Sequence, residues 1–262
     1  LWGNDYRNTA NDNTMIIAQI ESPTGVDNCE KIAAVPGVGN VGKLVVDTLN
    51  QEQNATLIAR IIHPDLPPHS VLEDGLLVPP HLSIHSVTLA DTKTVVTISG
   101  NGQPMTPRGQ HETAEAILGL ANEYSTPFAV VLAGLSANPG DEQIHLTSPS
   151  NDVKTTLEQR GVVVSTEQPS GGMLGLAGLI VSLAPLHQVM AAAYCAETVG
   201  TSVDVVTADR LAQRLSLDFE LGLDLPIDNT REMAARLLSM MEGKEIAGID
   251  LSEDDSGAGF YV

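Results

Sequence analysis

The sequence predicts an α/β domain in which helices cover both faces of a mostly parallel sheet, so that three layers follow in the order α/β/α. Two observations predict it. Short apolar, β-branched runs alternate along the chain with segments of helical periodicity, and such units join parallel strands through right-handed crossovers. The chain has 262 residues, 42% of them apolar, which is ample for the core of one large domain.

The first strand–helix–strand unit is expected between residues 31 and 62. Lys31–Val35 is a short apolar run that stops at Pro36, and a proline favours extended backbone in the residue before it. A glycine loop follows, and apolar residues then recur at helical spacing over residues 41–49. Thr56–Ile62 returns as a β-branched run, which predicts the second strand.

The alternation continues to residue 241. Ser202 and Asn229 are expected to begin the last two helices, because their side chains can accept hydrogen bonds from free backbone N–H groups. The apolar stretch at 173–186 is shorter than the roughly 20 residues of a membrane span, so a buried helix is expected there. Further strands are expected at Thr94–Ser99, Phe128–Leu132, Val162–Ser165 and Val189–Cys195, and further helices at Gln110–Tyr124, Val153–Gln159, Met173–Leu186, Val203–Leu221 and Thr230–Met241.

The composition divides the chain into three parts. Residues 1–14 are polar and lack the basic-then-apolar pattern of a signal peptide, so they are expected to form an N-terminal arm. Residues 15–243 are expected to form the α/β/α domain. Residues 244–262, rich in acidic residues and glycine, are expected to form a flexible tail.

Charge and cysteine content exclude several classes of partner. The 33 acidic and 13 basic side chains give a formal net charge of −20, which repels phosphate backbones and anionic lipid. Nucleic acid and membrane surfaces are therefore not expected as partners. Cys29 and Cys195 lie far apart without a companion metal-ligand spacing, so neither a disulfide framework nor a zinc site is indicated, and a reducing cytoplasm fits the chain. No metal and no cofactor are expected.

The glycine loop matches two nucleotide-binding patterns incompletely. Gly37, Gly39 and Gly42 spell G-x-G-x-x-G, and the stretch from Gly37 to Lys43 spells G-x-x-x-x-G-K. A P-loop needs Ser or Thr after the lysine as a magnesium ligand, and Leu44 stands there. A dinucleotide site needs a carboxylate at the tip of the second strand, which is not found there. A tight turn between strand and helix is the favoured interpretation, with an anion at the helix start as the alternative.

Two other segments carry candidate ligand groups. Gly100–Glu112 follows a strand and precedes a helix, the usual place for a site in an open α/β sheet, and offers Arg108, His111 and Glu112. No nucleophile elbow or nucleophile–base pair is evident, so no catalytic residue is predicted. Residues 63–85 contain four histidines without metal-ligand spacing, which favours a surface loop: His63, His69, His81 and His85.

Four stretches, in order, resemble the archaeal and bacterial relatives of the proteasome assembly chaperone 2 family: AAVPGVGNVGKLVVDTL, HPDLPPHSVLEDGLLVPP, GMLGLAGLIV and AYCAETVGTSVDVVTADRLAQRL. The resemblance spans about residues 31–241. It implies an α/β/α sandwich with a Rossmann-like sheet similar to that of nucleoside phosphorylases. It also implies a homo-oligomer and, as in archaeal members, binding to proteasome α subunits.

The last residues extend this resemblance. Phe260, Tyr261 and Val262 match the hydrophobic-tyrosine-any motif with which proteasome activators and some assembly chaperones dock between α subunits. Residues 252–259 precede them as a polar leash that can reach about 26 to 29 Å at ~3.3 to 3.6 Å per residue. The alternative is a terminal strand that packs back on the sheet.

The resemblance and the tail together predict a non-enzymatic factor that binds the proteasome as an assembly chaperone or an activator. The alternative is a nucleotide-binding enzyme, ligase-like or phosphorylase-like, that uses the loop from Gly37 to Lys43 and the Gly100–Glu112 loop. A third possibility is a structural oligomer whose tail lies on a neighbouring subunit.

Overall fold

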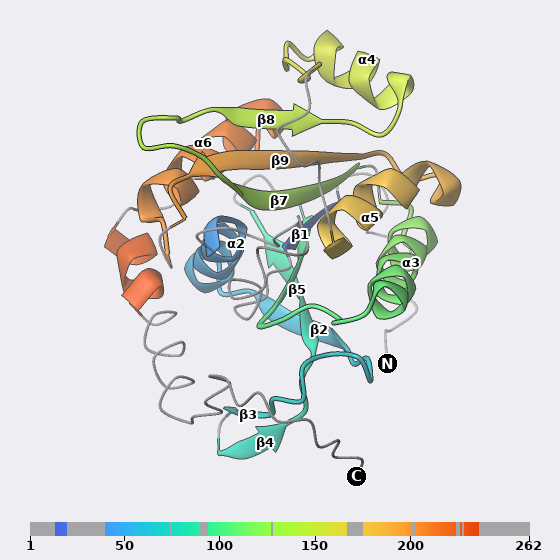
Figure 1. Cartoon of the computed structure of the whole chain (residues 1–262), viewed down its shortest axis with the longest axis vertical. Helices are drawn as coiled ribbons and strands as arrows, with labels where there is room; N and C mark the ends of the chain where they lie inside the picture. The colour runs from blue at the N-terminus through green and yellow to red at the C-terminus, as the bar shows by residue number, and fades with distance from the viewer. Residues whose placement is uncertain are drawn as a thin grey trace, which may run out of the picture.

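The computed structural model shows a mixed α/β fold, in which seven strands of the described residues form one sheet (Figure 1). It describes residues 14–19, 40–73, 75–89, 94–126, 128–166, 175–200, 203–223, 226 and 228–235. In spatial order the strands are β2, β5, β6, β1, β7, β9 and β8. Their bounds are β1 Thr14–Gln19, β2 Thr56–Ile61, β5 Leu82–Thr88, β6 Thr94–Gly100, β7 Phe128–Ser136, β8 Ile144–Thr147 and β9 Ala191–Thr198.

The sheet is mixed, so the prediction of a mostly parallel sheet is wrong. In its described part, the pairs β1–β6, β1–β7 and β7–β9 are parallel. The pairs β2–β5, β5–β6 and β8–β9 are antiparallel. A parallel connection needs a crossover of about a dozen residues or more. Because only residues 89–93 separate β5 from β6, these two neighbours have to run in opposite directions.

Four predicted strands are confirmed and one is wrong. The runs expected at 56–62, 94–99, 128–132 and 189–195 correspond to β2, β6, β7 and β9. Val162–Ser165 is not a strand; there Ser165 donates a backbone hydrogen bond to Leu146 of β8 at 2.7 Å. Lys31–Val35 lies outside the described residues. The strands β1, β5 and β8 were not predicted from the sequence.

The predicted helices are present wherever the structure describes them. Residues expected at 173–186 form α5 and a following 3-10 helix, η3. The helix expected at Thr230–Met241 is described over residues 228–235. The bounds are α2 Val41–Glu52, α3 Pro107–Glu123, α4 Asn151–Gln159, α5 Gly175–Leu183, η3 Ala184–His187 and α6 Val205–Phe219.

Helices cover both faces of the sheet because alternate residues of its strands point to opposite sides. On β7, Val130 and Leu132 belong to one apolar core, which they share with residues of α2 and α6. Ala129 and Val131 belong to a second core, shared with α3 and α5. Figure 1 shows α2 and α6 on one side of the central strands and α3 and α5 on the other.

Two predicted helix starts are corrected. The N-cap of α6 is Asp204 rather than Ser202, and the Asp204 carboxylate accepts a hydrogen bond from the backbone N–H of Thr207. The next helix already includes residue 228, so Asn229 lies within it. The Asn229 side chain instead donates a hydrogen bond to Glu52 at the end of α2, at 2.7 Å.

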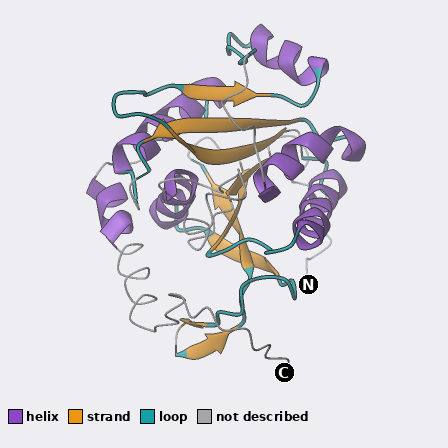
Figure 2. Cartoon of the chain, in the orientation of Figure 1, coloured by secondary structure: helices purple, strands orange, loops and turns teal. Residues whose placement is uncertain are grey.

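A separate two-stranded sheet lies between β2 and β5 in sequence. Its strands are β3, Val71–Glu73, and β4, Leu76–Val78, which pair antiparallel. Figures 1 and 2 show this hairpin away from the seven-stranded sheet, at the bottom of the view. The hairpin takes up part of the segment in which a surface loop was expected.

Candidate functional site

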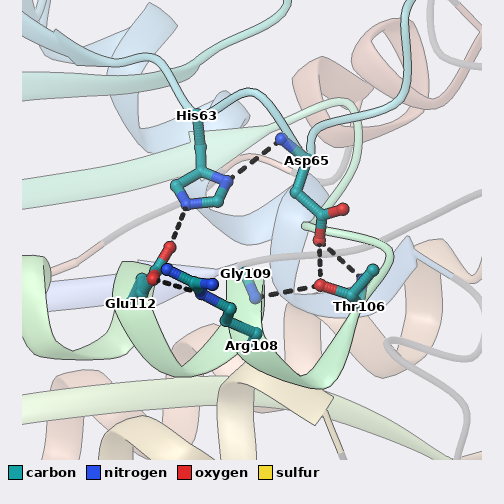
Figure 3. A network of polar contacts seen from close by, with 6 residues as sticks. All are labelled: His63, Asp65, Thr106, Arg108, Gly109 and Glu112. Atoms are coloured by element: carbon teal, nitrogen blue, oxygen red, sulfur yellow. Dashed lines mark hydrogen bonds and ion pairs between the residues drawn. The ribbon is translucent and has the colours of Figure 1, made fainter.

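A network of polar side chains joins the segment that follows β2 to the start of α3. Both β2 and β6 run antiparallel to β5, so their carboxyl ends reach the same edge of the sheet. This places residues 63–65, which follow β2, beside residues 101–106, which lead from β6 into α3. Figure 3 shows the side chains that meet there.

Asp65 links the loop after β2, residues 63–65, to the loop before α3, residues 101–106. Its Oδ2 accepts hydrogen bonds from the backbone N–H of Thr106 at 2.6 Å and from the Thr106 hydroxyl at 2.7 Å. The backbone carbonyl of Asp65 accepts a third, from Met105, at 3.0 Å. The hydrogen bonds from Thr106 lower the pKa of the Asp65 carboxyl below its usual value. The carboxylate therefore stays charged at neutral pH.

Thr106 also begins α3. Its Oγ1 accepts a hydrogen bond from the backbone N–H of Gly109 at 3.1 Å, and Pro107 follows in the first helical position, where no N–H is needed. Gly109 has a steric role, because a Cβ at this position would overlap the Asp65 carboxylate. The glycine thus allows Asp65 to approach the first turn of the helix.

His63 joins the network through both ring nitrogens (Figure 3). Nδ1 accepts a hydrogen bond from the backbone N–H of Asp65 at 3.1 Å. A neutral His63 therefore carries its proton on Nε2, which lies 3.0 Å from Oε2 of Glu112. Arg108 donates from Nε to Oε1 of the same carboxylate at 2.7 Å. Arg108 and, after it, His63 lower the pKa of Glu112, so this group is ionised and an acceptor at neutral pH.

The predicted ligand residues do not form one site. Arg108 belongs to the network above, whereas His111 faces Glu115 at 3.7 Å, and Glu115 also meets His187 at 3.0 Å. Gly42 and Lys43 lie in the first turn of α2, on the opposite face of the sheet. Lys43 is only 8% exposed, and its ammonium group pairs with the carboxylate of Asp47 at 2.7 Å. Gly37, Gly39, Phe260, Tyr261 and Val262 lie outside the described residues.

Two histidines of residues 63–85 have carboxylate partners on different elements, and His85 lies within β5 rather than in the surface loop that was expected. His63 faces Glu112, and His81 lies 3.6 Å from Glu73 of β3. Among the residues that the structure describes, no three His, Cys, Asp or Glu side chains are placed to hold a metal ion. No described helix is both long enough and apolar enough to cross a bilayer.

Sequence reasoning missed a second network at the same edge of the sheet, where β9 ends and α6 begins. Asp204 accepts hydrogen bonds from the hydroxyls of Thr198 at 2.6 Å and Thr207 at 2.8 Å. Glu197 accepts from the backbone N–H of Gln143 at 2.8 Å and lies 2.9 Å from His145 Nε2. Asp204 directly before an apolar helical run was the available signal, because Asp is a preferred N-cap residue.

Replacing Asp204 by alanine is expected to lower the free energy of unfolding by about 1 to 2 kcal/mol at pH 7, because a helix cap is lost. Burial raises the pKa of Asp204, but the hydrogen bonds from Thr198 and Thr207 outweigh it and leave the pKa lowered. A lowered pKa stabilises the fold above the unfolded-state value near 3.8, and this stabilisation disappears as the pH falls through the folded-state value. Urea unfolding from pH 7 to pH 3 measures it. A difference between variant and parent that stays constant below pH 4 would contradict the assignment.

Both networks tie loops and helix starts to strand ends through side-chain hydrogen bonds. In the first, the carboxylates of Asp65 and Glu112 are acceptors with lowered pKa values, which does not suit a general acid at neutral pH. The geometry therefore provides rigid attachment of surface segments.

Comparison with family models identifies one family that covers most of the chain. A model of the PAC2 family matches residues 32–243. An uncharacterized protein of Methanocaldococcus jannaschii is 23% identical over 202 residues, which are 76% of this chain and 77% of that protein.

Solved structures share the fold at low identity. Pyrococcus furiosus PbaA, described as an archaeal homolog of proteasome-assembly chaperone, has a TM-score of 0.67 at 21% identity, covering 90% of this chain and 95% of its own. Pyrococcus furiosus PbaB, described as an archaeal proteasome activator, has a TM-score of 0.68 at 18% identity, with 89% and 93% covered. A PAC2 family protein from Streptomyces avermitilis has a TM-score of 0.64 at 16% identity, with 89% and 98% covered.

Proposed function

The chain belongs to the PAC2 family, and from this premise we propose that it is a non-enzymatic factor that binds the proteasome as an assembly chaperone or an activator. The observation that carries the proposal is the family match over residues 32–243. Two proteins of the same fold, described as a homolog of proteasome-assembly chaperone and as a proteasome activator, support it. The role implies a cytoplasmic location.

The proposed docking residues are Phe260, Tyr261 and Val262, which enter pockets between proteasome α subunits. Phe260 fills an apolar slot, and Tyr261 buries its ring while its hydroxyl keeps a hydrogen bond. Burial of each large apolar side chain contributes about 1.5 to 3 kcal/mol, whereas ordering each residue costs about 1 to 2 kcal/mol. One such segment therefore binds weakly. Several copies in a homo-oligomer raise the local concentration to about the millimolar range, which makes docking effective.

The polar networks are compatible with this role because they hold surface loops to the strands and helices beside them. His63, Asp65 and Glu112 attach the segment after β2 to α3, and Asp204 attaches the end of β9 to α6. Such attachments make a binding surface rigid, so that less conformational entropy is lost when a partner binds.

The alternative function, nucleotide-dependent catalysis, requires that a nucleotide binds to the chain. The ammonium of Lys43 is already held by Asp47, so a phosphate at the start of α2 would have to compete with that carboxylate. We expect no increase in the melting temperature of the chain with NAD, ATP or nucleosides. A nucleotide at 100 times its dissociation constant would stabilise the fold by about 2.7 kcal/mol, so a clear upward shift with any of them would favour the enzyme.

The experiment that tests the proposal is affinity purification of the tagged, intact chain from an extract of its own organism. We expect proteasome α subunits among the recovered proteins. A tagged, unrelated protein with a similar net charge serves as the control, because a chain of charge −20 attracts basic proteins without specificity. Recovery of α subunits in equal amounts with the control would refute the proposal.

A further inference from the structure

The loop between β6 and α3 contains the one Asn–Gly pair of the sequence, Asn101–Gly102. In such a pair the backbone nitrogen of the glycine can attack the side-chain amide carbon of the asparagine. A side chain on the second residue hinders this attack, and glycine has none. The pair belongs to the segment in which ligand groups were expected, but the contacts with Asp65 use only Met105 and Thr106, at the end of this loop.

Both reacting groups of the pair are free within the part of the chain that the structure describes. The Asn101 side chain is exposed, and no hydrogen bond holds its amide or the backbone N–H of Gly102. The strand β6 ends at Gly100, so neither residue is fixed in the sheet. Loop backbone of this kind is more mobile than a strand or a helix, which lets the nitrogen approach the amide carbon.

Asn54 provides a contrast within the same chain. It is exposed and lies in the turn between α2 and β2, but Ala55 follows it, and the backbone N–H of Ala55 donates to Asn50 at 2.8 Å. Asn138 is followed by proline, which has no N–H to lose. The exposed asparagines of α3 and α4 are held in helical backbone. Among the described asparagines, Asn101 alone combines exposure with a free and unhindered neighbour.

The absence of a side chain at position 102 also serves packing. A Cβ there would lie 3.1 Å from Cγ and 3.3 Å from Cδ of Pro67, in the segment that follows β2. These distances are shorter than ordinary van der Waals contact, so a larger residue would push the two segments apart. Gly102 therefore allows the loop to pack against Pro67, and it leaves Asn101 open to attack.

We propose that Asn101 is a site of spontaneous covalent modification, at which asparagine is converted to aspartate and isoaspartate. The backbone nitrogen of Gly102 forms a bond to Cγ of Asn101, the bond from Cγ to the side-chain nitrogen breaks, and ammonia leaves with the proton of the N–H. Water then opens the cyclic imide. Opening at Cγ gives aspartate, and opening at the backbone carbonyl carbon gives isoaspartate. One water is consumed and one ammonia is released.

The isoaspartate product changes the loop directly before a buried contact. Its main chain runs through the side-chain carbons, which adds one atom to the backbone before Gly102. The next residue, Gln103, is buried, and its Oε1 accepts a hydrogen bond from the backbone N–H of Leu176 at the start of α5, at 3.2 Å. The added atom is expected to displace Gln103 from this contact. Aspartate keeps the normal backbone and adds only a charge.

The test is peptide mapping by mass spectrometry of the purified full chain during storage in warm, mildly alkaline buffer. The peptide with Asn101 is expected to change from amide to acid at least about tenfold faster than the peptide with Asn54, because no Cβ hinders the attack. An isoaspartate-specific carboxyl methyltransferase with labelled S-adenosylmethionine measures the isoaspartate fraction. Asn101→Gln, whose longer side chain closes the ring far more slowly, is expected to lose most of this label. Asn54→Gln is the matched control and is expected to keep it.

Equal rates at Asn101 and Asn54 would overturn the inference, as would labelling that Asn101→Gln leaves unchanged. A synthetic peptide with the sequence of residues 96–107 reports the reaction without the fold. If this peptide reacts and the folded chain does not, the loop protects Asn101 and the inference is wrong. Urea unfolding then compares the parent, Asn101→Asp and the purified isoaspartate form. The isoaspartate form is expected to unfold at the lowest urea concentration, and equal midpoints would refute the effect on Gln103.

Discussion

Replacing Gly109 by alanine is expected to lower the free energy of unfolding by about 2 to 4 kcal/mol. The added Cβ would lie 2.8 Å from both Cβ and Cγ of Asp65 and would overlap its Oδ2. Overpacking of this kind costs about 1 to 3 kcal/mol. Asp65 also has to move away from Thr106, and each hydrogen bond that is lost costs about 1 kcal/mol more. Urea unfolding measures the effect.

The same helix provides the control. Gly119 lies in the interior of α3, and a Cβ there would meet nothing within 4 Å. Gly119→Ala is therefore expected to stabilise the protein by about 0.5 to 1 kcal/mol through helix propensity. In a double-mutant cycle, Asp65→Gly should remove most of the penalty of Gly109→Ala, since the clashing atoms are gone. Equal effects of the two alanines on stability would show that the approach of Asp65 does not matter.

Replacing Tyr261 by alanine is expected to weaken binding to proteasome α subunits by about 100-fold, without changing the fold. A tyrosine buries about 150 to 250 Å² in a pocket, and alanine loses most of this contact. When several copies of the segment bind together, the loss of affinity at each copy adds to the loss for the whole oligomer. Titration of labelled α subunits with the parent and the variant measures the effect. Because the proposal gives Tyr261 a role in docking and none in the fold, the melting temperature is expected to stay the same.

Ser256→Ala provides the matched control, because it removes a small polar group from the same segment. It is expected to bind α subunits like the parent. If Tyr261→Ala also binds like the parent, residues 260–262 are not the docking element, and another surface of the domain has to carry the interaction.

Strands with a strong apolar run were predictable from the sequence. TVVTIS and the run that begins at Phe128 became β6 and β7, because β-branched and apolar residues fit a buried strand whatever lies beside them. The strand β5 was missed because prolines and histidines precede it, and these predict a loop. It pairs antiparallel with β6 because the connection between the two strands is too short for a crossover. Missing β5 led to the wrong prediction of a mostly parallel sheet.

The candidate site was predictable only in part. Arg108 and Glu112 were identified because a segment between a strand and a helix is the usual place for polar groups that work together. The partners of Glu112 and Thr106 were not identified, since His63 and Asp65 are 49 and 41 residues away in sequence. The strand order brings them together, and strand order depends on long-range packing. The role of Gly109 is visible only once Asp65 is in place.

We propose that this PAC2 family chain binds the proteasome. The most direct measurement is sedimentation of the purified, intact chain with purified proteasome core particle from the same organism, over a range of chain concentrations. Saturable co-sedimentation is expected, with a dissociation constant in about the micromolar range or below. Absence of co-sedimentation at about 100 μM chain, with the domain folded and self-associated, would contradict it.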